Sequence, residues 1–324
     1  MQATTATEIS VVVPVYGCRD CLEALVDRVA TVLTGVADFE ILLVDDRSID
    51  GSWEHARSLA TSRPWLRPIR LSRNFGQHAA LTAGLAQSRG AHVVVMDCDL
   101  QDPPEAIPLL LAKARDGYDV VLARRGRRPD RLRLRLAKKA YYRLARTFAR
   151  IDADPGVGNF SLISRKVVNA FLTVGELNRQ YLLVLYWLGF DRAIVDVPSQ
   201  ERHSGSSSYT TRQLFRVALD GLFFQTTLML GTITAVGMGI AALGLLSAVG
   251  IAILHVVSRG PAGWASLATL TLVLGGTILT SVGVAAMYCG RIFEQVKGRP
   301  LYIIDVEEEP SPVPATRELD PASQ

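Results

Sequence analysis

The chain has 324 residues, of which 49% are hydrophobic and 20% are charged, and its formal net charge at pH 7 is +4. This length holds one large globular domain and additional elements. The charges are unevenly distributed, because no Asp, Glu, Lys or Arg occurs in residues 221–258 or 260–290. A membrane-spanning helix needs about 20 apolar residues, so this distribution excludes a purely soluble protein. No nucleic-acid partner is expected.

The first 125 residues alternate apolar strands with helical patterns. We expect strands at residues 9–16, 39–46, 66–72, 91–97 and 119–125, and intervening helices at 22–33, 52–62, 78–88 and directly after the fourth strand. Continuous β-branched runs between helices predict an α/β fold with a mostly parallel sheet covered on both faces. Ligands bind such sheets at the carboxyl ends of the strands. Residues 1–210 are expected to form this domain.

Polar side chains follow three of these strands. They are Asp45 and Asp46 after the second, Arg73 and Asn74 after the third, and Asp97 and Asp99 after the fourth. Asp97 and Asp99 share strand parity, so both can face one site, to which Gln101 adds an amide oxygen. Hard divalent cations prefer such oxygen ligands. The pair is therefore predicted to bind a metal or a ribose, and Asp45 to accept hydrogen bonds from a base or ribose.

Two acidic turns are expected to begin helices. Asp102-Pro103-Pro104-Glu105 combines a cap residue, prolines in the first turn and an acid near the positive end of the helix dipole. Ser48 and Asp50 are interpreted as turn and cap residues before the second helix. The stretch VPVYGCRD after the first strand has one glycine, which argues against a dinucleotide fingerprint and against a P-loop.

The four cysteines are Cys18, Cys21, Cys98 and Cys289. Cys18 and Cys21 lie between a strand and a helix with the spacing of a redox dithiol. No further Cys or His stands near them in the sequence to complete a metal site. A cytoplasmic domain argues against structural disulfides. We therefore favour two ordinary thiols at a helix start over a redox pair.

Residues 130–151 are predicted to form a basic amphipathic helix. Apolar residues recur at four-residue spacing from Leu136 to Phe148, and eight Lys or Arg residues occupy much of the remainder. Such a helix suits an anionic membrane surface, although an ordinary surface helix of the domain has the same pattern. Residues 211–226 are interpreted as a second amphipathic helix next to the membrane.

Residues 227–290 are predicted to form two transmembrane helices, at about 229–257 and 265–289, joined by a short link. Basic residues flank this hairpin at Arg212, Arg216, Arg291, Lys297 and Arg299, whereas the link holds Arg259. This bias predicts a multi-pass protein of the plasma membrane with both flanks, and so the N-terminal domain, in the cytoplasm. The N-terminus lacks the pattern of a signal peptide. Residues 291–324 are expected to be a cytoplasmic tail, disordered from about 307.

Six motifs occur in order along the chain: VVVPVYG, LVDDRSIDGS, LSRNFGQHAALTAGL, VVVMDCDLQDPPE, RHSGSSSY and, after the hairpin, RIFEQVKGRPLYII. In these motifs, from about residue 9 to 305, the chain resembles the polyprenyl-phosphate glycosyltransferases of glycosyltransferase family two. The resemblance implies a Rossmann-like GT-A domain that transfers one sugar from a UDP- or GDP-sugar to undecaprenyl or dolichyl phosphate. The product would serve cell-envelope glycan or glycoconjugate synthesis, and a homo-oligomer stays open.

The resemblance also implies roles for residues at matching positions. Asp97, Asp99 and Arg202 are the implied catalytic residues, and Asp99 and Gln101 would hold Mg²⁺ or Mn²⁺ on the donor diphosphate. The implied contacts to the nucleotide sugar are Pro14, Tyr16, Asp45, Arg73, Asn74, Gln77 and Asp97. The implied contacts to the acceptor phosphate, which suits arginine, are Arg124, Arg202 and Ser206.

The expected reaction inverts the configuration of the anomeric carbon. A metal stabilises the nucleotide diphosphate as it leaves. The acceptor is a phosphate monoester with a second pKa of about 6, by analogy with phosphorylated side chains. It is already an anion near neutral pH, so no strong general base is needed. The greater difficulty is bringing two anions together, which the metal and the arginines offset.

Three stretches depart from the family pattern. Val-Pro-x-x-Asn-Glu, Gly-Asp-Phe and Gly-x-Ser-Lys-Tyr are replaced by VPVYGC at 13–18, GNF at 158–160 and GSSSY at 205–209. The changes remove a Glu near the nucleotide, an Asp proposed as a base and a Lys near the acceptor phosphate. They indicate a subgroup with its own donor sugar, because Asp97, Asp99, Gln101 and Arg202 remain.

Two other functions stay open. A processive polysaccharide synthase normally carries a Gln-x-x-Arg-Trp signature, whereas this chain has Asn178-Arg179-Gln180-Tyr181 in the relevant region. Two spans are also few for a channel. The second alternative is a non-catalytic lipid-binding or assembly subunit, against which the intact acidic set speaks.

Overall fold

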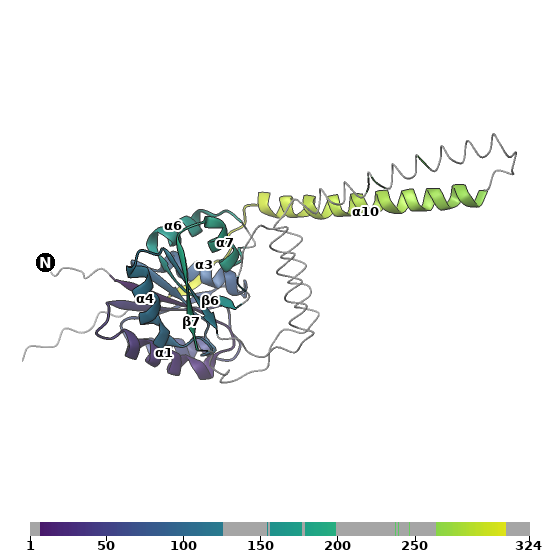
Figure 1. The fold of residues 1–324 in the computed structure, drawn as a ribbon. Coiled ribbons are helices and arrows are strands. Elements are labelled where there is room, and N and C mark those ends of the chain that lie inside the picture. Colours follow the sequence, from purple (N-terminus) through teal and green to yellow (C-terminus); the bar gives the residue numbers. More distant parts are fainter. Residues whose placement is uncertain are drawn as a thin grey trace, which may run out of the picture. The chain divides into compact units, whose positions relative to one another are not determined.

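The computed structural model describes residues 7–125, 154, 156–176, 179–198, 237, 239, 246 and 264–308. Within them the strands form one eight-stranded sheet with the order β7-β5-β6-β4-β1-β2-β3-β8 (Figure 1). The strands are β1 (Ile9–Val15), β2 (Phe39–Asp45), β3 (Leu66–Leu71), β4 (His92–Val95), β5 (Val120–Arg125), β6 (Val157–Ser164), β7 (Arg192–Val197) and β8 (Ile304–Glu307). The first four are parallel neighbours, as the sequence predicts.

Helices cover both faces of the sheet (Figure 1). One face carries α1 (Arg19–Leu33), α2 (Ser52–Ala60) and α4 (Ile107–Arg115), and the other carries α3 (Gln77–Gln87), α6 (Arg165–Thr173) and α7 (Tyr181–Leu188). The alternation of side chains along a strand divides the apolar core between the faces. In β1, Val11, Val13 and Val15 pack in the first core and Val12 in the second. The chain therefore has the α/β architecture with a mostly parallel sheet that the sequence predicts, as expected for the GT-A domain that the resemblance implies.

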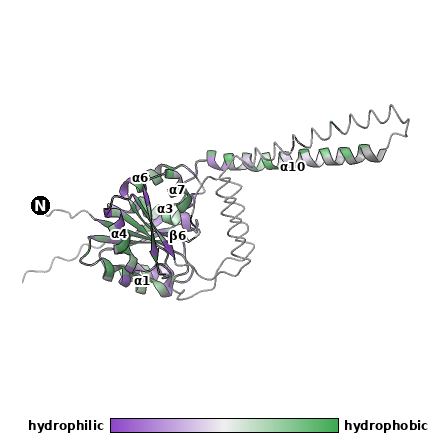
Figure 2. Cartoon of the chain, viewed as in Figure 1, coloured by the Kyte–Doolittle hydropathy of each residue, from purple (hydrophilic) through white to green (hydrophobic). Residues whose placement is uncertain are grey.

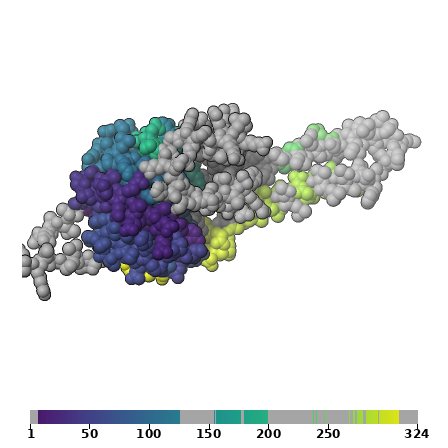
Figure 3. All heavy atoms as spheres, turned by 90° about the horizontal axis from the view of Figure 1, so that it is seen from below, coloured from purple at the N-terminus to yellow at the C-terminus, as the bar shows by residue number. Residues whose placement is uncertain are grey.

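Small residues allow the layers to approach closely. Gly84 of α3 lies against β1, where a Cβ atom would be 2.3 Å from Cγ1 of Val12. On the opposite face, α1 and α2 lie next to each other, in the purple and blue part of the surface in Figure 3. Gly51 precedes α2 with a φ of +82°, and Asp50 Oδ1 accepts the Ser52 amide at 3.1 Å. This contact agrees with the turn expected there, but the expected cap is wrong, because Gly51 is the N-cap of α2 and no side chain caps the helix.

Two elements differ from the sequence-based prediction. Strand β6 is antiparallel and lies between β4 and β5, so the fourth and fifth predicted strands are not neighbours. Strand β8 pairs antiparallel with β3, aligning Ile69 with Glu307 and Arg70 with Val306. Residues 304–307 were assigned to a tail, and that assignment is wrong because their backbone groups complete the edge of the sheet. Residues 309–324, most of the stretch predicted to be disordered, lie outside the described part of the chain.

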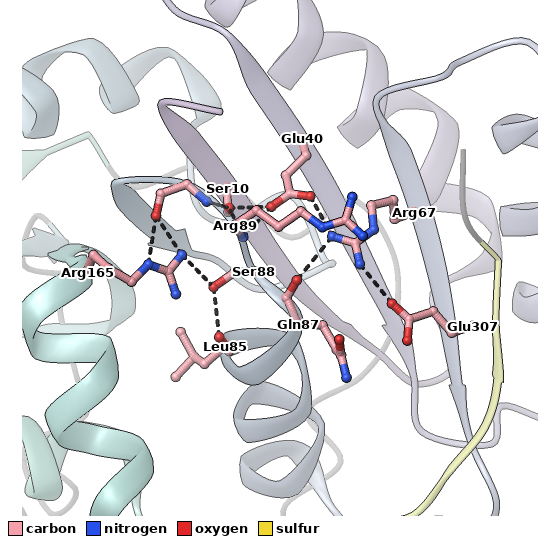
Figure 4. Close-up of polar contacts among 10 residues, drawn as sticks. Ser10, Glu40, Arg67, Leu85, Gln87, Ser88, Arg89, Arg165 and Glu307 are labelled. Atoms are coloured by element: carbon pink, nitrogen blue, oxygen red, sulfur yellow. Dashed lines mark hydrogen bonds and ion pairs between the residues drawn. The ribbon is translucent and has the colours of Figure 1, made fainter. Parts of the chain in front are cut away.

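A buried polar network occupies the amino-end edge of the parallel strands (Figure 4). Arg67 of β3 is 1% exposed and donates from Nη1 to Glu40 Oε2 at 2.6 Å and from Nη2 to Glu307 Oε1 at 2.8 Å. Glu40 Oε1 accepts from the Ser10 hydroxyl at 2.6 Å and from the Arg89 amide at 2.6 Å. The network thus joins β1, β2, β3 and β8, on the edge away from the strand ends where ligands bind.

Helix α10 (Trp264–Val296) is a separate, mostly apolar element (Figure 2). Within the described residues, it contains the one segment long and apolar enough to cross a membrane, Leu274–Val296. The helix covers the second predicted span, 265–289, and continues seven residues further. The first predicted span lies outside the described residues apart from residues 237, 239 and 246.

Candidate functional site

The carboxyl ends of β1, β2, β3 and β4 lie at one edge of the sheet, because these strands are parallel and adjacent. Val15 is aligned with Asp45, and Val12 with Val95, so the loops that leave these strands begin close together. The strand ends and these loops carry Tyr16, Asp45, Asp46, Arg73, Asn74, Asp97 and Asp99. The topology thus gathers at one edge the residues that the sequence marks as candidates.

Asp45 is the last residue of β2, and 2% of its side chain is exposed. Its Oδ1 accepts a hydrogen bond from the Ser48 amide at 3.1 Å. Its Oδ2 lies 3.3 Å from Nε of Arg70, an ion-pair distance, but accepts no hydrogen bond from the described residues. Buried polar atoms are normally hydrogen-bonded. The Oδ2 atom is therefore suited to accept a hydrogen bond from a ribose or base.

Asp46 shapes the loop after β3. Its carboxylate accepts the amides of Phe75 at 2.7 Å and Gly76 at 2.8 Å. Burial raises the pKa of Asp46, and the two amide donors oppose that rise. In the same loop, Arg73 lies over the Phe75 ring with 4.3 Å between its guanidinium carbon and the ring centroid. Arg73 and Asn74 are exposed, so both can reach a ligand at this edge.

Asp97 follows β4 and contacts several polar groups. Its Oδ1 accepts Nε2 of Gln77 at 2.7 Å, and its amide donates to Asp102 Oδ2 at 3.1 Å. Burial and the neighbouring carboxylate of Asp102 raise the pKa of Asp97 to about 6, while Arg125 and a hydrogen bond from Asn159 lower it. A cation bound beside Asp97 would favour its ionised form.

Arg125, the last residue of β5, is a candidate that sequence reasoning missed. Its guanidinium donates to Asp102 Oδ1 from Nε at 3.0 Å and from Nη2 at 2.7 Å, and to Gln101 Oε1 from Nη1 at 3.3 Å. The same Nη2 lies 3.6 Å from Asp97 Oδ2. Arg125 is therefore the positive partner of the acidic residues in the described structure.

The sequence places an arginine at the end of β5, but it does not show whether Arg124 or Arg125 faces the acidic residues. Two arginines end β5, and successive side chains of a strand point to opposite faces. Arg124 points away from the acidic residues and pairs with Asp196 of β7, with its Nε 2.6 Å from Oδ1. It also contacts Asp154 at 3.2 Å. Only the pairing of β5 with β6 and β7 decides which arginine faces the site.

The expectation that Asp102 caps the next helix is wrong. The side chain of Asp102 is completely buried and binds Arg125 and the Asp97 amide instead. A 3₁₀ turn, Pro104–Ala106, leads into α4, and no side chain caps either element. Glu105 pairs with Arg28 at 2.7 Å. Asp102 therefore supports the site rather than the helix.

Asp99 and Gln101 are half-buried and flank Leu100, whose φ is +60°. The Gln101 amide donates to Asp99 Oδ1 at 3.1 Å. In the part of the chain that the structure describes, no three His, Cys, Asp or Glu side chains are grouped to hold a metal. Mg²⁺ and Mn²⁺ take few protein ligands and accept water and phosphate oxygens for the rest. The hard oxygens of Asp99 and Gln101 fit a metal that arrives with a diphosphate.

The structure describes only some of the other candidate residues. Pro14 is buried within β1, and Tyr16 beyond its end is 54% exposed. Arg202 and Ser206, predicted to bind the acceptor phosphate, lie outside the described residues. The amphipathic helices predicted at 130–151 and 211–226 lie there too.

Cys18 and Cys98 are joined by a disulfide, and their Cα atoms are 6.2 Å apart. The sequence-based expectation of ordinary thiols at Cys18 and Cys21 is therefore wrong for Cys18. Cys21, the partner that a redox dithiol of this spacing would need, is buried and is not part of the disulfide. The partner of Cys18 stands 80 residues away, between Asp97 and Asp99. Sequence spacing alone cannot indicate such a partner.

Known proteins resemble this chain over most of its length. The model of a family described as glycosyl transferase family 2 matches residues 10–172. An uncharacterised glycosyltransferase of Synechocystis sp. is 37% identical over 92% of this chain and 94% of its own. A prophage-derived bactoprenol glucosyl transferase of Shigella flexneri is 34% identical over 94% of this chain and 100% of its own. A mycobacterial protein of known crystal structure shares the fold, with a TM-score of 0.50 and 23% identity over 67% of this chain and 73% of its own.

Proposed function

Because this chain belongs to glycosyl transferase family 2, we propose that it transfers one sugar from a nucleotide-sugar donor to a polyprenyl phosphate. One observation carries the proposal: the chain is similar, over 94% of its length, to a bactoprenol glucosyl transferase. The acidic edge of the sheet supports it, because it offers oxygen ligands and hydrogen-bond acceptors beside one another. The product would be a lipid-linked sugar for the cell envelope.

The donor is proposed to bind across the ends of β1 to β4. The Oδ2 atom of Asp45, which accepts no hydrogen bond from the described residues, suits a ribose hydroxyl or a base N–H. Asp97, fixed by Gln77 at 2.7 Å, would contact the sugar and the diphosphate side of the donor. Pro14, Tyr16, Arg73 and Asn74 complete the proposed pocket. UDP- and GDP-sugars both fit this donor set.

Mg²⁺ or Mn²⁺ is proposed to be held by Asp99 and Gln101. When bound, the metal supplies Lewis-acid stabilisation of the charge on the leaving diphosphate. The chain's own residues prepare the position: Asp102 holds Arg125, and Arg125 holds Gln101 and faces Asp97. Arg125 thereby limits the mutual repulsion of the carboxylates before the ligands bind.

The acceptor phosphate is proposed to attack the anomeric carbon directly, with inversion. A phosphate monoester is already an anion near neutral pH, since its second pKa is about 6. Asn159, where many members of the family have Asp, hydrogen-bonds Asp97 and cannot act as a base. Arg202 and Ser206 are proposed to bind this phosphate, and Arg202 to assist catalysis by balancing its charge. Arg124 is proposed to join them, for which its guanidinium must leave Asp196 and Asp154.

The enzyme is proposed to be anchored in the plasma membrane by two helices, with its catalytic domain in the cytoplasm. The apolar segment Leu274–Val296 supports one of these spans. A membrane anchor suits an acceptor whose polyprenyl chain resides in the bilayer.

The decisive experiment incubates the purified full chain with undecaprenyl or dolichyl phosphate and a panel of nucleotide sugars, with Mg²⁺ or with EDTA. We expect a glycosylated lipid from one donor, and its loss in EDTA. Asp99→Ala should lower turnover by about a hundredfold or more, since a metal contributes several kcal/mol to such transition states. The exposed Asp116→Ala is the control and should be active. If no donor yields a glycolipid, the proposed function is refuted; full activity of Asp99→Ala would refute the metal assignment.

A further inference from the structure

Cys98 occupies an unusual place, between two carboxylates of the candidate site. It follows Asp97 and precedes Asp99, yet its own side chain packs in the apolar core beneath α1 and α4 and is 8% exposed. Strand β4 ends at Val95, so Cys98 lies in the turn that carries both carboxylates. A bond made by Cys98 is therefore transmitted directly to both carboxylates.

Cys18 belongs to the loop that follows β1, one of the loops proposed to hold the donor. It directly precedes α1 and follows Gly17, whose φ is +69°. Its sulfur lies 3.7 Å from the carbonyl oxygen of Tyr16, one of the residues proposed to contact the donor. Cys18 is half-buried, so small solutes can reach its sulfur, and it packs against the core that contains Cys98.

The backbone places the two residues at a distance that one disulfide spans. Their Cα atoms are 6.2 Å apart, within the usual range of about 4.4–6.8 Å. Reducing compartments keep most cysteines as thiols, and the proposed cytoplasmic location makes the dithiol the resting form. The disulfide in the structure is then the oxidised form of the same pair.

We propose that Cys18 and Cys98 form a reversible redox site that switches off sugar transfer when it is oxidised. The inference rests on the proposed function, because it concerns regulation of the same site. Oxidation ties the loop after β1 to the Asp97–Asp99 turn and fixes the distance between the two. Asp99 and Gln101 then cannot adjust their oxygens around an incoming metal and diphosphate, whereas the dithiol leaves both loops free to do so.

The chemistry is a thiol–disulfide exchange with a low-molecular-weight disulfide as the oxidant. The thiolate of Cys18 attacks one sulfur of that disulfide, forming a mixed disulfide and releasing one small thiol. The thiolate of Cys98 then attacks the Cys18 sulfur, forming the Cys18–Cys98 bond and releasing the second small thiol. The protein loses two electrons and two protons, and both are recovered in the two small thiols. Excess small thiol reverses the sequence.

The test compares the full chain in detergent after incubation with oxidised glutathione or with dithiothreitol. Peptide mapping by mass spectrometry identifies which cysteines are paired. Two readouts follow: glycolipid formation, and the affinity for Mn²⁺ in the presence of UDP or GDP, measured by electron paramagnetic resonance. Oxidised protein should contain the Cys18–Cys98 peptide pair and lose about tenfold in both readouts, the range seen when groups supporting a metal site are disturbed. Dithiothreitol should restore both.

Matched variants separate this pair from other thiols. Cys18→Ser should form no bond to Cys98 and should keep its activity and Mn²⁺ affinity in oxidised glutathione. Cys21→Ser, three residues away, and Cys289→Ser should respond as the wild type does. The proposal is overturned if oxidised wild-type protein lacks the bond, if the bond forms without changing either readout, or if Cys18→Ser responds equally. Absence of transfer in the reduced protein would refute the proposed function instead, while the Mn²⁺ readout would still decide the redox inference.

Discussion

The carboxyl group of Asp97 lies near both a negative group, Asp102, and a positive group, Arg125, and the balance between them sets its pKa. Arg125 is 3.6 Å from one of its oxygens, but Asp102 and burial outweigh that attraction and raise the pKa of Asp97 to about 6. An isolated Asp has a pKa of about 3.9. The folded chain therefore binds an extra proton between these values, and ionising Asp97 above pH 6 costs stability.

This ionisation predicts a pH-dependent effect of Asp97→Asn. In EDTA, the variant should have a higher melting temperature than the wild type near pH 7.5. The advantage should shrink as the pH falls through about 6 toward 4, because the wild-type carboxyl becomes protonated. Thermal unfolding of the full chain in detergent, followed across this pH range, measures the difference. Asp116→Asn is the control for a pH-independent offset, and a constant advantage of Asp97→Asn at every pH would contradict the assignment.

The neighbouring arginines at the end of β5 should differ sharply when replaced. Arg125→Gln removes the partner of the fully buried Asp102 carboxylate, and an unpaired buried polar group costs about 1–3 kcal/mol. We expect a lower melting temperature together with a large loss of transfer. Arg124→Gln breaks exposed pairs with Asp196 and Asp154, so its melting temperature should change little.

Steady-state kinetics in both substrates complete this comparison. If Arg124 binds the acceptor phosphate, Arg124→Gln raises the KM for polyprenyl phosphate and leaves the KM for the donor unchanged. An unchanged acceptor KM would remove Arg124 from the acceptor site. Equal losses of stability in the two variants would contradict the expectation that the pair with buried Asp102 stabilises the fold more than the pair with exposed Asp196.

At the scale of elements, β8 brings the stretch after α10 back to the sheet. Three arginines from different parts of the domain hold its acidic residues: Arg47 pairs with Asp305, Arg57 with Glu308 and Arg67 with Glu307. The first two pairs are exposed and contribute little. The third belongs to the buried network of Figure 4, in which Glu40 and Arg67 have almost no access to water.

Arg67→Ala should therefore destabilise the domain far more than Arg57→Ala does. Removing Arg67 leaves Glu40 as a buried charge without its partner, which typically costs about 3–5 kcal/mol. Arg57 is 55% exposed, so its removal is the matched control with a small effect. Urea unfolding of the two variants, followed by tryptophan fluorescence, measures the difference. Similar unfolding midpoints would show that other groups stabilise the buried Glu40 carboxylate when Arg67 is absent.

At the scale of the whole molecule, the proposed membrane topology makes a further prediction. A variant with all four cysteines changed to Ser provides the background for single substitutions. Gly260→Cys, in the link between the proposed spans, should react with a membrane-impermeant maleimide in intact cells. Lys297→Cys, beyond α10, should react after the cells are lysed. The reverse pattern would invert the topology, and labelling of both in intact cells would contradict a hairpin.

The sequence determined the layered α/β architecture, because the evidence for it is local. The runs ILLV at 41–44 and VVV at 93–95 are apolar on both faces, as buried parallel strands require. The helical patterns between the strands require crossover connections, which allow few topologies for the sheet. The position of Asp45, Asp97 and Asp99 at strand ends, and the apolar segment around 274–289, followed from the same local patterns.

The tertiary structure alone decided which distant residues meet. Asp102 looked like a helix cap until β5 placed Arg125 beside it, and residues 304–307 looked like a tail until β3 paired with them. Cys18 found its partner in Cys98 rather than in Cys21. The reason is physical: strand order and register are set by the packing of the whole core. A short stretch of sequence therefore specifies its own conformation but not its neighbours.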